Sequence, residues 1–144
     1  IKIGVFDLWI GNRDRKPDNP NVLISIDDNN KYFFHPIDHT AAFGHLTNYL
    51  EVRDIMLHID SRNCILNALF SRSLFKSFKP EIKNYINADI ESCINCAIQN
   101  LDFIFEQIPQ QYEFGRKSKQ HMKNFFSDTK RNKDILNLYP HYLR

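Results

Sequence analysis

The sequence predicts a mainly helical domain that carries one small β-hairpin near its N-terminal end. The hairpin is indicated by two apolar runs of β-type residues, 22–26 and 32–37, which flank the polar turn 27–30. The helices are indicated by apolar residues that recur every three or four positions, most clearly over 88–108. A length of 144 residues favours a single compact domain.

Composition and charge exclude several classes of protein. The formal net charge is +2, from 19 basic and 17 acidic side chains that are well mixed, so no nucleic-acid-binding surface is expected. No apolar run approaches the roughly 20 residues of a membrane-spanning helix, and no signal peptide is visible. Three cysteines make an odd count, which argues against a disulfide framework and predicts a cytoplasmic location.

The first elements lead from an apolar segment into a polar loop. Residues 3–10 are apolar except for Asp7, and we favour a helix that ends near residues 11–12 over a short strand. Asp7 then either lies on a helix face or supports the following loop. Residues 13–20 are charged and contain two prolines, which predicts a loop. The hairpin follows, and Asp38 leaves its second strand at the open end.

The remainder of the chain is expected to be helical. Pro109 ends the periodic segment 88–108, and Pro140 follows the last helix, because proline interrupts helices. Cys93 and Cys96 form a Cys-x-x-C pattern inside the periodic segment, where we expect buried small apolar residues rather than a redox or metal site. The other predicted helices span 47–60, 64–78, 80–86, 116–127 and 128–138.

Three polar residues form the pattern that suggests chemistry. Asp14 and Asn19 lie in the loop, and antiparallel pairing of the hairpin strands returns Asp38 to the same end. Phosphoryl transfer needs one carboxylate to accept or orient the proton of the attacking hydroxyl. It also needs an amide oxygen and a second carboxylate to hold Mg²⁺ against the nucleotide phosphates. For the loop alone, the alternative is a solvated connector with turn-forming Asp and Asn.

The N-terminal third of the chain resembles the HipA-like kinases, a bacterial branch of the protein-kinase-like superfamily. The resemblance is carried by FDLWIGNRDRKPDNPNVLI at 6–24 and by FHPIDHTAAF at 34–43. Phosphatidylinositol kinases have a similar Gly-Asn-x-Asp-Arg loop followed by an Ile-Asp turn. The motif pair is fairly specific, because its elements agree in both order and spacing.

The resemblance implies roles for individual residues. Asp14 is the counterpart of the catalytic aspartate, and Asn19 and Asp38 are the counterparts of residues that bind Mg²⁺ and, through it, ATP. Lys16 is a departure, since many relatives in the wider group have histidine after the Asp-Arg pair. Four further motif residues are expected to support the loop geometry: Asn12, Arg15, Asn21 and His39.

The resemblance also implies the fold and the domain organisation. The chain would form the C-terminal lobe of a protein-kinase-like fold, with the catalytic loop and hairpin at 1–44 and a helical subdomain at 45–144. Its four glycines are isolated and it does not begin with Met, so we expect the N-terminal ATP-binding lobe to be absent from this chain. That lobe would belong to a missing segment or to a partner chain.

The leading hypothesis is therefore an ATP- and Mg²⁺-dependent phosphotransferase, a HipA-like Ser/Thr protein kinase. Its expected partner is a protein substrate with a Ser or Thr hydroxyl. Two alternatives stay open. One is a lipid or small-molecule kinase of the same superfamily, and the other is a non-catalytic helical interaction domain.

Overall fold

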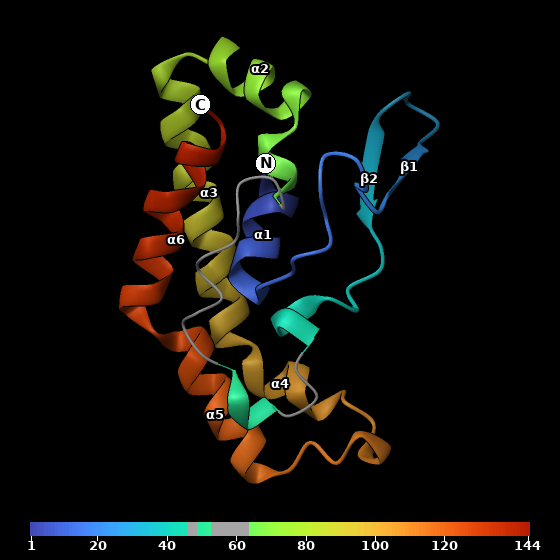
Figure 1. Ribbon diagram of the computed structural model, residues 1–144, viewed down its shortest axis with the longest axis vertical. Helices are drawn as coiled ribbons and strands as arrows, with labels where there is room; N and C mark the ends of the chain where they lie inside the picture. Colours follow the sequence, from blue (N-terminus) through green and yellow to red (C-terminus); the bar gives the residue numbers. More distant parts are fainter. Residues whose placement is uncertain (46–48, 53–63) are drawn as a thin grey trace.

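The computed structural model describes residues 1–45, 49–52 and 64–144, and it places a two-stranded hairpin beside a group of helices (Figure 1). This arrangement confirms the prediction of a mainly helical chain with one small hairpin. The short 3₁₀ helices are Ala42–His45, Tyr49–Glu51, Ile65–Asn67 and Gln110–Tyr112. The longer elements are α1 (Lys2–Ile10), β1 (Val22–Ile26), β2 (Tyr32–Pro36), α2 (Leu69–Ser77), α3 (Pro80–Gln99), α4 (Leu101–Glu106), α5 (Arg116–Ser127) and α6 (Thr129–Tyr142).

Helix α1 is anchored in the apolar core by residues from the other end of the chain. Leu8 is fully buried, and the Trp9 indole donates from Nε1 to Oδ1 of Asn132 at 3.0 Å. The buried guanidinium of Arg131 lies 3.8 Å from the ring centre of Phe125 and donates to the carbonyl oxygen of Trp9. The C-terminal end of α1, where the polar loop begins, is therefore fixed against α5 and α6.

The hairpin has few apolar neighbours outside itself. Its strands pair antiparallel, with Val22 opposite Pro36 and Ile26 opposite Tyr32. At its tip, Asp27 accepts hydrogen bonds from the backbone N–H groups of residues 29 and 31, which closes the turn. Its large apolar side chains are exposed: Leu23, Ile24, Ile26, Tyr32, Phe33 and Phe34. The hairpin therefore adds little to the apolar core.

Some predicted helix boundaries were wrong. The predicted segment 80–86 and the first part of 88–108 form one helix, α3, which ends at Gln99. The rest of 88–108 contains the short α4, which follows Asn100. The Asn100 amide donates to the carbonyl oxygen of Cys96 at 2.8 Å, and such side-chain bonds compete with continued helix. Helix α6 continues through Pro140 to Tyr142. Pro140 lacks the N–H that would bond to residue 136, but only two helical residues follow it, so the lost bond affects the end of α6 alone.

The predicted burial of Cys93 and Cys96 was also wrong, because both cysteines are exposed. Ile90 and Ile94 face the core, whereas Cys93 comes one position before Ile94 and Cys96 comes two positions after it. At about 100° per residue, neither cysteine points in the direction of Ile94. The predicted helix 64–78 is confirmed in part, because the 3₁₀ helix Ile65–Asn67 comes first and the α-helix α2 follows at Leu69–Ser77. The predicted helix 47–60 lies mostly outside the described residues, and its described part is the short 3₁₀ helix at 49–51.

Candidate functional site

The candidate site begins where α1 ends. Gly11 adopts a left-handed backbone with φ 64°, and its N–H is bonded to the carbonyl oxygens of Asp7 and Leu8. The N–H of Asn12 also donates to the carbonyl oxygen of Asp7, at 2.8 Å. Glycine adopts this conformation without the steric penalty of a side chain, as at many helix C-termini. The chain therefore enters the loop 12–21 at a fixed point and in a fixed direction.

A buried polar cluster, made of Asp7, Asn12 and Arg15, lies under the loop. The three residues are 3%, 1% and 1% exposed. One oxygen of Asp7, Oδ1, accepts from Nδ2 of Asn12 at 3.0 Å, and the other, Oδ2, accepts from Nε of Arg15 at 2.8 Å. Burial raises the pKa of the Asp7 carboxyl, while Arg15 and Asn12 act in the opposite direction. The sequence left two roles open for Asp7, a residue on a helix face or a support for the following loop. These contacts show that Asp7 supports the loop.

Arg15 connects three separate segments of the chain. Its Nη1 donates to the carbonyl oxygens of Pro20 and Ile37, both at 3.1 Å, and to that of Asn21. Its Nη2 donates to Nδ1 of His39 at 3.3 Å. A guanidinium offers five donors in a rigid plane, which suits this many acceptors. Helix α1, the end of the loop and the segment after β2 are thereby held at one point.

Asp14 lies at the centre of the predicted catalytic loop. Its backbone N–H donates to Oδ1 of Asn12 at 3.2 Å. Its Oδ2 accepts from the amide groups of Asn19, at 3.5 Å, and Asn21, at 3.4 Å. The ammonium group of Lys16 is 3.8 Å from Oδ1. The structure thus brings Asp14 and Asn19 together, as the spacing suggested, and adds Asn21 to the pair.

Asp38 is tied to this group through the backbone. It is exposed and has a left-handed backbone with φ 54°. The preceding N–H, of Ile37, donates to the carbonyl oxygen of Asn21 at 2.9 Å. The hydroxyl and N–H of Thr40 donate to Oδ1 of Asp38, and these bonds lower the pKa of Asp38. In the described part of the chain, Asp38 makes no direct hydrogen bond to Asp14.

The oxygen atoms of this site suit a hard cation. Asn19 uses its amide nitrogen toward Asp14, which leaves its carbonyl oxygen for another partner. Asp38 receives both Thr40 bonds on Oδ1, which leaves Oδ2. Mg²⁺ binds carboxylate and amide oxygens, so the donor types fit this ion. Among residues 1–45, 49–52 and 64–144, no group of three or more His, Cys, Asp or Glu side chains is arranged to hold a metal by itself.

Comparison with protein families decides the identity of the chain. The family model described as HipA-like kinase matches residues 1–140. The chain belongs to the HipA-like kinase family. The match covers the helical region as well as the two motifs, so HipA-like membership no longer depends on the motifs alone. Searches of curated proteins and of solved structures found no match. None of the helices in the described ranges has the length and apolar character needed to cross a membrane.

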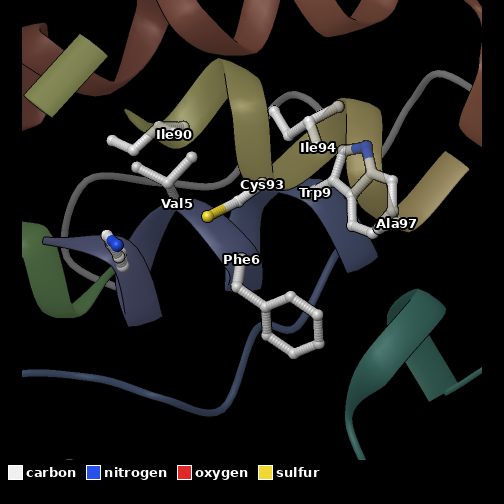
Figure 2. Close-up of a pocket in the computed structure, with 8 residues that line it drawn as sticks. Val5, Phe6, Trp9, Ile90, Cys93, Ile94 and Ala97 are labelled. Atoms are coloured by element: carbon white, nitrogen blue, oxygen red, sulfur yellow. The ribbon is translucent and has the colours of Figure 1, made fainter. Parts of the chain in front are cut away.

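An apolar pocket that sequence reasoning missed lies next to the site, between α1 and α3 (Figure 2). It has a volume of about 190 Å³, and Val5 and Trp9 from α1 face Ile94 of α3 across it. Phe6 also lines this pocket, and its ring centre is 5.9 Å from that of His39. The lining is mostly apolar, with Lys2 as its one charged residue, and it includes none of the predicted site residues.

Sequence reasoning left the role of Asp7 open, although a signal for it was present. Asp7 is the one charged residue in the apolar run 3–10, and a carboxylate in a buried helix needs a partner. Arg15 follows eight positions later, beyond a helix-ending glycine. Neither observation alone fixes the pair, because the distance between the two side chains depends on the turn at Gly11.

Proposed function

We propose that this chain supplies the phosphate-transfer site of an ATP- and Mg²⁺-dependent Ser/Thr protein kinase of the HipA-like family. The observation that supports this most directly is the arrangement around Asp14. Its backbone is bonded to Asn12, and its carboxylate is bonded to Asn19 and Asn21. A carboxylate held in this way can receive a proton from one defined direction.

Asp14 acts as the base in this proposal. It accepts the proton of the Ser or Thr hydroxyl while the hydroxyl oxygen bonds to the γ-phosphorus of ATP, and the bond from that phosphorus to the β,γ-bridging oxygen breaks to release ADP. Lys16 lies 3.8 Å from the Asp14 carboxylate and keeps a cation in the loop, where the phosphoryl group brings negative charge. A lysine can therefore replace the histidine of many relatives as a source of charge, although not as a hydrogen-bond acceptor.

Asn19 and Asp38 are the proposed ligands of Mg²⁺. When bound, the ion neutralises charge on the nucleotide phosphates. An exposed aspartate is an anion at neutral pH, and the Thr40 bonds lower the pKa of Asp38 further. The anion is the form that binds a cation. Arg15 holds the carbonyl oxygens of Asn21 and Ile37, so it fixes the separation between the loop and the Asp38 turn.

We infer that residues 1–44 form the catalytic loop and hairpin of one domain, with a helical subdomain at 45–144. No glycine-rich phosphate loop occurs among these 144 residues. In this proposal, the part that covers ATP lies outside these residues, in the full-length gene product or in a partner chain. Tests of activity accordingly need the full-length gene product.

The test compares Asp14→Asn and Asp38→Asn with Asp18→Asn in the full-length protein, using labelled ATP and Mg²⁺. Asp18 is an exposed acid in the same loop, so it is a matched control. We expect phosphate incorporation to fall by about 10²-fold or more in the first two variants, the usual contribution of a base or metal ligand. Wild-type incorporation by both variants would rule out the proposed mechanism.

The acceptor is tested separately. A panel of protein, lipid and small-molecule hydroxyls, presented with the same labelled ATP, distinguishes a Ser/Thr protein kinase from a lipid or small-molecule kinase. Calorimetric titration of the full-length protein with ATP and Mg²⁺ addresses the non-catalytic alternative. An interaction domain would give no Mg²⁺-dependent binding of the nucleotide.

A further inference from the structure

We propose that Asp7 is a positioning residue, which sets the geometry of the phosphate-transfer site from within α1. This inference rests on the proposed function, because the geometry matters only if Asp14 and Asp38 act together. Asp7 lies in a helix rather than in the loop and is 3% exposed. It touches neither Asp14 nor Asp38, but each of its oxygens holds the first residue of a path that leads to one of them.

The first path runs to Asp14. Oδ1 of Asp7 accepts from the amide nitrogen of Asn12, which turns the amide oxygen of Asn12 toward the loop. That oxygen accepts the backbone N–H of Asp14 at 3.2 Å. Rotating the Asn12 amide by half a turn would present donors to the Asp14 N–H. The orientation of Asn12, and with it the position of Asp14, thus depends on the carboxylate of Asp7.

The second path runs to Asp38. Oδ2 of Asp7 accepts from Nε of Arg15 at 2.8 Å, which leaves the far end of the guanidinium for the carbonyl oxygen of Ile37 and for His39. Ile37 and His39 are the two neighbours of Asp38 in the chain. The carboxylate of Asp7 therefore orients the guanidinium that holds both sides of Asp38.

A carboxylate is required because both paths begin with a donor. The Asn12 amide and the Arg15 Nε each donate to Asp7, so position 7 needs two acceptor oxygens. An asparagine at position 7 has almost the same shape but only one acceptor oxygen, and its NH₂ group would face a donor on one path. The rigid base for this arrangement is α1 itself, since the neighbouring Trp9 is bonded to Asn132 of α6.

The test uses Asp7→Asn in the full-length protein, with Ile135→Ala as the control. Ile135 is fully buried in α6, so its truncation lowers the melting temperature without touching the cluster. We expect Asp7→Asn to lower kcat at least tenfold and to raise the Mg²⁺ concentration for half-maximal rate. Ile135→Ala, assayed below its melting temperature, should keep the wild-type kcat and Mg²⁺ dependence.

A double variant, Asp7→Asn with Arg15→Gln, keeps the test decisive if the single variant is too unstable. It removes both buried charges, so no unpaired ion remains, yet glutamine cannot reach all the acceptors of Arg15. We expect the double variant to recover folding but not kcat. Wild-type kcat and Mg²⁺ dependence in a folded variant lacking the Asp7 carboxylate would overturn the proposal.

Hydrogen exchange on the nucleotide-free protein separates this inference from the proposed function. Loss of the Asp7 carboxylate should speed amide exchange at least tenfold in segments 12–21 and 37–40 and leave α5 and α6 unchanged. If Asp14→Asn retains full activity, the kinase mechanism fails, but the exchange result still reports on Asp7. Unchanged exchange in both segments would show that Asp7 does not position the site.

Discussion

The helical body and the loop region of this kinase-family chain are held together by different forces. In the body, apolar side chains from α1, α3, α5 and α6 form a continuous buried core. Under the loop, three polar residues, Asp7, Asn12 and Arg15, are buried and hydrogen-bonded to one another or to the backbone. Apolar burial is non-directional, whereas hydrogen bonds fix distances and angles. The loop region, where the proposed mechanism requires side chains at defined positions, is thus the region held by directional contacts.

Helix α1 belongs to both regions, and this joins them. Leu8 faces the apolar core and is fully buried, while the adjacent Asp7 faces the loop and bonds Arg15. Neighbouring positions in a helix point about 100° apart, so one short helix can serve both sides. Substitutions at such neighbouring positions separate the two forces experimentally.

The largest effect is expected from breaking the polar cluster at Arg15. Arg15→Met removes the partner of a buried carboxylate and a donor to three backbone carbonyl groups. Loss of one member of a buried ion pair typically costs about 3–5 kcal/mol, and we expect a loss of this size in the free energy of unfolding. Urea unfolding of the chain measures it.

The matched control is Lys16→Met, which makes the same type of change one position away. Lys16 is partly exposed, and its ammonium group is 3.8 Å from Asp14. Exposed ion pairs contribute about 0–1 kcal/mol, so this variant should unfold almost as the wild type does. Equal losses of unfolding free energy in the two variants would mean that the buried cluster contributes no more to stability than an exposed ion pair.

A slightly smaller effect is expected from Leu8→Ala, on the other face of α1. A buried leucine truncated to alanine costs about 2–5 kcal/mol through lost burial and the remaining cavity. This variant should have a lower free energy of unfolding than the wild type. Amide exchange under native conditions should not increase more in the loop 12–21 than in α5 and α6. Selective opening of the loop would instead show that the core and the cluster are one cooperative unit.

The difference between the regions also explains what the sequence could predict. The hairpin and α5 follow from local signals, two apolar β-type runs around a polar turn in one case and a helix after Gly115 in the other, and both were predicted closely. The break between α3 and α4 coincides with a side-chain bond of Asn100, which a pattern of apolar residues does not contain. The exposure of Cys93 and Cys96 was missed because it depends on how the other helices pack around α3, which an apolar pattern does not determine.

For the site, the loop motif predicted the grouping of Asp14 with Asn19, since five positions in a tight loop leave few arrangements. The bonds from Arg15 to Ile37 and His39 join residues 22 and 24 positions apart. Such contacts depend on where the hairpin returns, which spacing along the chain does not fix. The resemblance to kinases suggested that Arg15 supports the loop, but its acceptors could not be identified without the fold.

A third prediction concerns Cys64, a buried thiol of the core. Burial raises the pKa of Cys64 from 9.0 to about 11. The folded state therefore keeps a proton that the unfolded state releases, and stability should fall as pH rises from about 9 to 11. The rise in the pKa of Cys64 sets an upper limit of roughly 2–3 kcal/mol on this loss of stability. Urea unfolding of the wild type and Cys64→Ala at both pH values should show the extra loss only in the wild type.

Thiol labelling provides an independent check. Cys93 and Cys96 are exposed and Cys64 is buried, so two of the three thiols should react quickly at pH 8 and the third only on unfolding. Rapid reaction of all three thiols in the folded protein would contradict the burial of Cys64 and, with it, the expected pH dependence.

The smallest effect is expected in the hairpin, and a pair of phenylalanines measures it against the core. Phe34 is 56% exposed on β2, opposite Ile24, whereas Phe105 is 5% exposed in α4. Phe34→Ala removes a cross-strand contact worth about 0.2–1 kcal/mol, but Phe105→Ala should cost about 3–5 kcal/mol. Urea unfolding of both variants gives the comparison. Equal losses would mean that the hairpin shares in the core. A small loss of stability in Phe34→Ala would mean that the side chains of the hairpin do little to hold it in place. The position of the hairpin would then rely on Arg15 and on the backbone bonds at its open end.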